Sequence, residues 1–229
     1  MAGSSISGLT FLMISDTSLN GAASLNLIYL IFSSIFLYGG GVVLNDVFDF
    51  KIDQIERPER PIPKGEVSLK GAALFGSGLL LSGVFLSFFV NHLSGIIAVI
   101  LALTILLYDS YSKKYQFLGP LNMGLCRALN LILGMSVFGE IFHWMYAVIP
   151  LLYIFAITLI SRGEVYGQNK KHILWAGLLY AMVIFIVLMI VPNIRAQWVS
   201  LFPFMGLFIF LIYCPLFRAY RVNSPENIK

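Results

Sequence analysis

An apolar run changes abruptly into an acidic one within residues 22–53, which read AASLNLIYLIFSSIFLYGGGVVLNDVFDFKID. The first part, Ala22–Leu44, contains no charged residue. It is long enough to cross a bilayer as a helix, which takes about 20 residues. Backbone groups cannot be left without hydrogen bonds in lipid, so this part is predicted to be a membrane-spanning helix. The acidic part, Asn45–Asp53, then lies at the end of that helix.

Apolar segments of this kind recur along the chain. The 229 residues are 59% hydrophobic and 11% charged, with a mean hydropathy of +0.87, whereas ordinary soluble domains are about 45–50% apolar. Ile6–Ser15 is about half a span and is interpreted as a partial first helix. The sequence predicts an all-α, polytopic transmembrane bundle with about seven full spans plus the partial N-terminal one. We expect one domain over residues 1–229, with a truncated first helix. The further full spans are Gly71–Val90, Leu93–Tyr108, Leu121–Gly139, Met145–Ile160, Ile173–Val191 and Trp198–Phe217.

The net charge of +4 is explained by membrane topology, so no nucleic-acid partner is expected. Thirteen Lys and Arg residues fall in loops on one side of the predicted bundle, and only Arg195 falls in the opposite loops. Such a bias marks the cytoplasmic side. We predict a multi-pass protein of a bacterial inner membrane or a plastid membrane, surrounded by lipid and with a cytoplasmic C-terminus. The thirteen residues are Lys51, Arg57, Arg60, Lys64, Lys70, Lys113, Lys114, Arg162, Lys170, Lys171, Arg218, Arg221 and Lys229.

Three aspartates, Asp46, Asp49 and Asp53, follow the first full span at spacings i, i+3 and i+7. At 100° per residue they occupy a stripe about 60° wide on one helical face, flanked by Asn45. Carboxylates this close repel one another unless a cation neutralises them, and their oxygens suit Mg²⁺ bridging to phosphate. The alternative is a solvated helix end with Lys51 and later arginines as counter-charges. We favour a Mg²⁺ site because ionisable groups at membrane depth are costly.

The next segment, Arg57–Ser68, reads RPERPIPKGEVS. Its prolines cannot continue a helix, so it is predicted to be a loop that closes over the helix end. Arg57, Arg60 and Lys64 are candidates to bind a diphosphate, the arginines through their bidentate fork and the lysine as a point charge. The alternative for each is an anchoring charge at the cytoplasmic face of the membrane.

These two segments together carry a family resemblance. The pattern Asn-Asp-x-x-Asp-x-x-x-Asp at Asn45–Asp53, followed by Arg-Pro-x-Arg-Pro-Ile-Pro-x-Gly-x-Val-Ser at Arg57–Ser68, resembles the first aspartate-rich motif of the UbiA prenyltransferase superfamily. The resemblance implies a helical membrane bundle. It also implies that Asn45, Asp46, Asp49 and Asp53 bind Mg²⁺ and the diphosphate of an isoprenoid donor.

Basic residues elsewhere extend the expected diphosphate site. Lys113 and Lys114 lie in Tyr108–Pro120, which resembles the family's basic loop before its fifth helix; the alternative is an interfacial anchor. Arg127 is placed inside a predicted span, where a charge needs a partner. It is expected to face the central cavity and pair with a carboxylate or the diphosphate. The alternative is an arginine that snorkels to the interface.

A second, incomplete motif follows the sixth segment, where members of the superfamily usually carry two aspartates at i and i+4. Here Glu164 and Gln168 have that spacing, and Ser161 completes an i, i+3, i+7 pattern of oxygen-bearing side chains. Glu164 is the anionic member, so a second Mg²⁺ would be held more weakly, or Arg162 would compensate part of the diphosphate charge. The string Ser-Arg-Gly-Glu-Val at 161–165 is similar to a divergent UbiA-like branch, the EboC-type proteins, whose substrate is unidentified.

The predicted function is Mg²⁺-dependent transfer of an isoprenyl group from a prenyl diphosphate to an aromatic or lipid acceptor. Asp46, Asp49, Asp53 and Glu164 are the expected metal ligands and catalytic residues, because they stabilise the leaving diphosphate as the allylic C–O bond ionises. A noncatalytic lipid-binding or transport protein is the alternative, favoured by the incomplete second motif. A CDP-alcohol phosphatidyltransferase ranks third, since its Asp-Gly-x-x-Ala-Arg opening is missing from the sequence.

Overall fold

A computed structural model describes residues 21–141, 144–165, 170–190, 203, 206–214 and 217. No β-strand occurs within these ranges, which confirms the all-α prediction. The α-helices include α2 (Gly21–Glu56), α3 (Leu69–Val90), α4 (His92–Ser110), α5 (Leu118–Met135), α6 (Val148–Val165) and α7 (Lys170–Ile190). Short 3₁₀ turns are η1 (Ser112–Lys114), η2 (Ser136–Phe138) and η3 (Trp144–Ala147).

The described helices are those of a multi-pass membrane protein. Five segments are long and apolar enough to span a bilayer, fewer than the seven full spans predicted, and Leu174–Met189 is a shorter apolar helix. Of the predicted span Trp198–Phe217, the continuous helical part that is described is 206–214. The predicted partial helix Ile6–Ser15 lies outside the described residues. The five spans are Leu25–Glu56, Leu69–Val90, His92–Ser110, Leu118–Phe138 and Trp144–Ser161.

Helix α2 is longer than a bilayer requires. Its 36 residues extend over about 54 Å at 1.5 Å per residue, whereas the hydrocarbon core is about 30 Å thick. The helix continues for about three turns beyond the predicted span end at Leu44 and ends at Glu56, just before Pro58. Ser68 then caps α3 by accepting a hydrogen bond from the Gly71 amide at 3.1 Å. The predicted loop Arg57–Ser68 is therefore confirmed.

The chain divides into two compact units. The first is Met1–Lys114 with Leu125–Ala147, and the second is Tyr115–Gly124 with Val148–Lys229. Helix α5 contributes residues to both units. The extent of the single domain over residues 1–229 stays a prediction.

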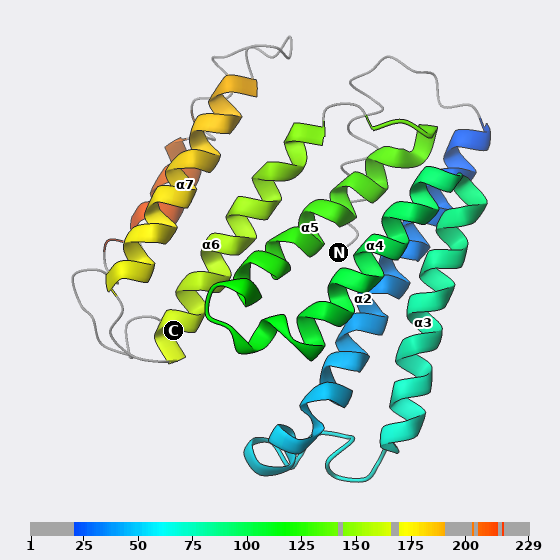
Figure 1. Cartoon of the computed structure of the whole chain (residues 1–229). Helices are drawn as coiled ribbons and strands as arrows, with labels where there is room; N and C mark the ends of the chain where they lie inside the picture. The colour runs from blue at the N-terminus through cyan, green and yellow to red at the C-terminus, as the bar shows by residue number, and fades with distance from the viewer. Residues whose placement is uncertain are drawn as a thin grey trace. The chain divides into compact units, whose positions relative to one another are not determined.

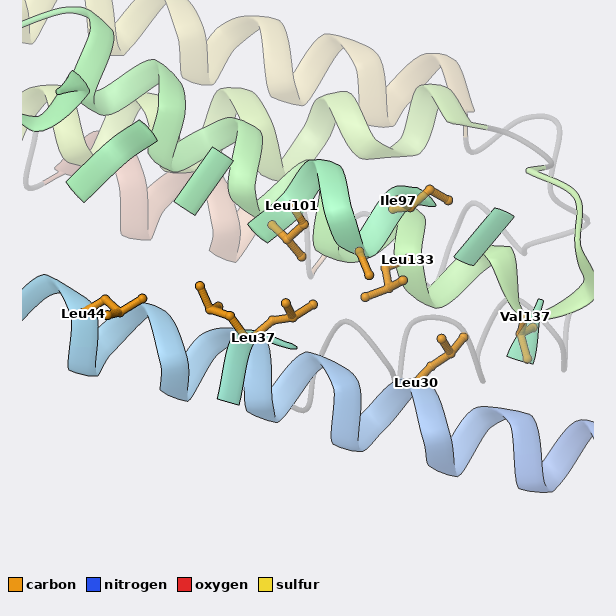
Figure 2. Close-up of a cluster of buried hydrophobic side chains, with 9 residues drawn as sticks. Leu30, Leu37, Leu44, Ile97, Leu101, Leu133 and Val137 are labelled. Atoms are coloured by element: carbon orange, nitrogen blue, oxygen red, sulfur yellow. The ribbon is translucent and has the colours of Figure 1, made fainter. Parts of the chain in front are cut away.

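In the first unit, α2, α3 and α4 pack side by side (Figure 1). Leu30, Leu37 and Leu44 recur every seven residues along one face of α2 and are almost completely buried. Figure 2 shows them pointing from α2 toward Ile97, Leu101, Leu133 and Val137, which belong to α4, α5 and η2. This apolar contact fixes the rotation of α2 about its axis and so determines the direction of its polar end.

Small residues bring α2 and α3 close together. A Cβ at Gly40 would lie 2.8 Å from the Gly76 carbonyl oxygen, and a Cβ at Gly83 would lie 3.0 Å from the Ser33 carbonyl oxygen. Ser33 Oγ donates a hydrogen bond to the Gly83 carbonyl at 2.7 Å and lies 2.7 Å from Ser87 Oγ. Small residues and interhelical hydroxyl bonds are the usual means of packing membrane helices, because lipid gives no hydrophobic drive between them.

We predict that Gly40→Ala lowers the free energy of unfolding by about 1–3 kcal/mol, because the new methyl group overlaps the backbone of α3. Gly78 in α3 is the matched control, since a Cβ there meets nothing within 4 Å. Gly78→Ala should leave stability unchanged or raise it by up to about 1 kcal/mol through helix propensity. Thermal or denaturant unfolding in detergent measures both. Equal effects of the two substitutions would show that α2 and α3 do not pack closely at Gly40.

In the second unit, α6 packs against α7 around Ala156, Ala176 and Tyr180. Tyr213 Oη donates a hydrogen bond to the Gly177 carbonyl at 3.0 Å. Gly124 of α5 lies against α6, where a Cβ would come within 2.4 Å of the Leu151 carbonyl oxygen. The unit therefore uses the same close contact through small residues as α2 and α3.

Candidate functional site

Polar side chains from three segments meet at the end of α2. We call them the polar cluster, and every member lies in the first unit. Helix α2 provides an acidic face, the loop after α2 provides Arg60, and the end of α4 with the following turn provides Asp109 and Lys113. The cluster consists of Asn45, Asp46, Asp49, Asp53, Arg60, Asp109 and Lys113.

Arg60 joins the two ends of the aspartate stripe. One terminal nitrogen of its guanidinium donates to Asp46 Oδ1 and to Asp53 Oδ2, both at 2.7 Å. The Asp53 side chain is 6% exposed and that of Asp46 is 38% exposed, so Asp53 is the member that depends on Arg60 for charge compensation. Partial burial opposes the charged form of Arg60. The hydrogen bond to Asp53 and the charges of Asp46, Asp53 and Asp49 nevertheless raise its pKa.

Lys113 compensates the middle aspartate. Its ammonium lies 2.6 Å from Asp49 Oδ1, and both side chains are largely buried. This is an ion pair without the angles of a good hydrogen bond, since Lys113 Nζ is buried and has no hydrogen-bond partner among the described residues. The pair also places the loop after α2 and the turn after α4 at the same end of the first unit, as the predicted alternation of loops requires.

Asp109 also belongs to this cluster, which the spacing along α2 did not indicate. It is 3% exposed at the end of α4, and its Oδ1 accepts a hydrogen bond from Asn45 Nδ2 at 2.8 Å. Its sequence position, directly after an apolar span and four residues before Lys113, was the only available signal. The hydrogen bond follows from α2 and α4 packing together, which no local pattern specifies.

Other predicted residues near the cluster lie outside it. Arg57 is exposed, and Lys64 is exposed and forms an ion pair with Glu66 of the same loop. Lys114, next to Lys113 in η1, is also exposed. All three remain able to approach a ligand from solvent, and their predicted diphosphate contacts stay predictions.

The remaining predicted residues lie in α5, in α6 or just after it. Arg127 is partly buried in α5 and has interactions of its own. Ser161 is exposed on α6. Arg162 and Glu164 are within the helical part of α6, but their side chains lie outside the described residues, as does Gln168 entirely. The second motif therefore stays a prediction.

The polar cluster suits a hard divalent cation that is bound partly by the protein and partly by a phosphate ligand. In the described part of the chain, no three His, Cys, Asp or Glu side chains are grouped closely enough to surround one ion. The aspartates are spread over two helical turns, and each already has a basic partner. Mg²⁺ usually keeps one or two protein carboxylates and completes its shell with water and substrate phosphate, so this donor set suits Mg²⁺ brought in together with a diphosphate.

A sequence model of the UbiA prenyltransferase family matches residues 5–227. The chain belongs to this family. The identification of Asn45, Asp46, Asp49 and Asp53 as the family's first aspartate-rich motif stays a prediction. The narrower similarity to the EboC-type branch stays a prediction.

Among UbiA relatives, the digeranylgeranylglyceryl phosphate synthase of Methanococcoides burtonii is 41% identical over 111 residues, which cover 48% of this chain and 40% of that protein. The synthase of the same name from Methanocaldococcus jannaschii is 35% identical over 158 residues, which cover 69% of this chain and 52% of that protein. The chain therefore matches about half the length, or less, of these archaeal relatives.

Two solved structures share the UbiA fold. One comes from work on digeranylgeranylglyceryl phosphate synthase in membranes; it superposes with a TM-score of 0.74 at 25% identity, covering 99% of this chain and 85% of that one. The apo structure of a UbiA homolog from Aeropyrum pernix K1 has a TM-score of 0.78 at 14% identity, covering 99% and 89%. The second likeness concerns the fold alone. The predicted UbiA-like helical bundle is confirmed.

Proposed function

We propose that the chain is a Mg²⁺-dependent intramembrane prenyltransferase, which transfers an isoprenyl group from a prenyl diphosphate to a lipid acceptor. The observation that supports this most is the polar cluster itself. It combines a face of carboxylates that can bind a cation with two cationic side chains, Arg60 and Lys113, that can bind diphosphate oxygens. Membership of the UbiA family supports the same reaction.

One or two of the carboxylates of Asp46, Asp49 and Asp53, with the amide oxygen of Asn45, are proposed to hold Mg²⁺, and water and diphosphate oxygens would complete its shell. The bound ion would supply positive charge at the diphosphate as the allylic C–O bond breaks. Arg60 and Lys113 add fixed positive charges in a partly buried site, where they act more strongly on a leaving anion than in water. When the diphosphate binds, its oxygens compete with the aspartate carboxylates for ion pairs with the Arg60 guanidinium and the Lys113 ammonium.

The acceptor is proposed from the relatives. Digeranylgeranylglyceryl phosphate synthases are named for a lipid product that carries two geranylgeranyl groups on glyceryl phosphate. We therefore propose geranylgeranyl diphosphate as the donor and a glyceryl phosphate lipid with one geranylgeranyl group as the acceptor. The prenyl tails are proposed to extend from the polar end into apolar space among the helices.

The test is incubation of the purified full chain with labelled geranylgeranyl diphosphate, Mg²⁺ and geranylgeranylglyceryl phosphate. We expect equal amounts of released diphosphate and doubly prenylated lipid, both lost on adding EDTA. An aromatic acceptor serves as the competing substrate. Tight diphosphate binding without release or product would instead indicate the noncatalytic lipid-binding alternative.

A substitution of Glu164 tests catalytic prenyl transfer against noncatalytic lipid binding in a second way. If the second motif assists departure of the diphosphate, Glu164→Gln should slow turnover about tenfold for each 1.36 kcal/mol of stabilisation lost, while donor binding changes less. Single-turnover kinetics measures this directly. Glu140→Gln is the control, because it makes the same change of charge at an exposed residue outside both motifs. An unchanged rate in Glu164→Gln would remove the second motif from the mechanism.

A further inference from the structure

A hydrogen bond between helices determines how Asn45 is oriented. Asn45 Nδ2 donates to Asp109 Oδ1 at 2.8 Å, so a residue of α4 holds a residue of the aspartate motif on α2. An ionised carboxylate can only accept hydrogen bonds, so the nitrogen end of the amide must face Asp109. The oxygen end, Oδ1, then faces away and receives no hydrogen bond from any described residue.

A charged side chain at position 109 is not needed to join α4 to α2, because a neutral hydrogen-bonding group could do the same. A neutral pair can also join two helices of the first unit: Ser34 Oγ donates a hydrogen bond to Asn130 Oδ1 at 2.9 Å. Asp109 is instead a carboxylate that is 3% exposed, and its Oδ2 is buried without a hydrogen-bond partner among the described residues. Burying a carboxylate costs more free energy than burying a neutral acceptor. We therefore expect the charge of Asp109 to have a functional role beyond helix packing.

We propose that Asp109 is a positioning residue, which fixes the Asn45 amide so that its oxygen is directed to the cation and diphosphate. This inference rests on the proposed function. A neutral partner at 109 would accept from, or donate to, either end of the amide and so allow it to turn over. The Asp109 carboxylate excludes the flipped Asn45 amide, because the amide oxygen would then face a carboxylate oxygen and both atoms are hydrogen-bond acceptors. Residues that orient a metal ligand in this way typically change metal affinity by about 10–100-fold when removed.

Exchanging the two side chains distinguishes positioning from simple structural support. Asn45→Asp alone sets two carboxylates against each other and should weaken binding. Combining Asn45→Asp with Asp109→Asn restores an amide-to-carboxylate hydrogen bond, but the amide donor now lies on α4 and the carboxylate acceptor on α2. One carboxylate oxygen at position 45 is again free for the cation, and the net charge is that of the unmodified protein.

The experiment is calorimetric titration of inorganic pyrophosphate into the purified full chain, with and without Mg²⁺, and thermal unfolding of each variant in parallel. We expect Asn45→Asp and Asp109→Leu each to weaken Mg²⁺-dependent affinity about tenfold or more. The exchanged pair Asn45→Asp/Asp109→Asn should bind nearly as tightly as the unmodified protein. Asp109→Asn alone, which keeps the shape of the side chain and removes its charge, should give an intermediate loss.

Three results would overturn the inference. An exchanged pair that unfolds at the normal temperature but binds as poorly as Asn45→Asp would show that orientation at position 45 is irrelevant. Asp109 variants that unfold earlier yet keep full affinity would show that Asp109 only ties α4 to α2. No Mg²⁺-dependent pyrophosphate binding by the unmodified protein would overturn the proposed function and this role together, which makes that failure recognisable.

Discussion

Asp49→Asn lowers the rate of prenyl transfer about a hundredfold, the loss typical when one electrostatic stabiliser of a transition state is removed. Asp49 sits in the middle of the carboxylate face, and its Oδ1 forms the ion pair with Lys113. The substitution removes a proposed metal ligand and leaves Lys113 buried without its counter-charge. Asp46→Asn should act in the same direction. Single-turnover assays with excess enzyme measure the effect.

Glu59→Gln is the matched control for this prediction. It makes the same change of charge and shape on an exposed residue of the adjoining loop. Its rate should stay near that of the unmodified protein, since its carboxylate is solvated. A similar rate loss in Glu59→Gln and Asp49→Asn would mean that general surface charge, rather than the carboxylate face of α2, drives the reaction.

Arg60→Ala lowers the free energy of unfolding by about 2–3 kcal/mol, and it also weakens diphosphate binding. The guanidinium is the hydrogen-bonding partner of Asp53, whose side chain is 6% exposed. Removing one member of such a pair leaves a buried carboxylate uncompensated, and hydrogen bonds to charged groups contribute about 1.5–3 kcal/mol. Thermal or denaturant unfolding without ligand measures this stability loss.

Arg57→Ala and a second substitution make the Arg60 prediction specific. Arg57 carries the same charge three residues earlier but is exposed, so its loss should change stability by less than about 0.5 kcal/mol. Asp53→Asn added to Arg60→Ala should recover part of the loss, because the buried group is then neutral. If Asp53→Asn gives no recovery, Arg60 stabilises the loop through some other contact.

The acidic face of α2 could be predicted because it depends on local geometry. The spacing of Asp46, Asp49 and Asp53 needs only the helical period, and α2 does continue through all three before ending at Glu56. The prolines of Arg57–Ser68 likewise require a loop whatever the tertiary structure. Both features are set by neighbours in the sequence, so they follow from it directly.

The partners of these carboxylates could not be predicted in the same way. Arg57, Arg60 and Lys64 were equivalent candidates in the sequence, yet Arg60 is the one that contacts Asp46 and Asp53. The choice depends on how the loop folds back onto α2. Asp109 and Lys113 join the cluster only because α4 packs beside α2, and contacts between distant segments leave no periodic signal.

The proposed function requires a divalent cation and a diphosphate to bind together at the acidic end of α2. Electron–nuclear double resonance tests it most directly, with Mn²⁺ replacing Mg²⁺ and inorganic pyrophosphate as the ligand. For the purified chain we predict protein-bound Mn²⁺ coupled to ³¹P, and loss of that signal in the Asp46→Asn/Asp49→Asn double variant. The same Mn²⁺–³¹P coupling in the double variant, or bound Mn²⁺ without coupling in the unmodified protein, would contradict the claim.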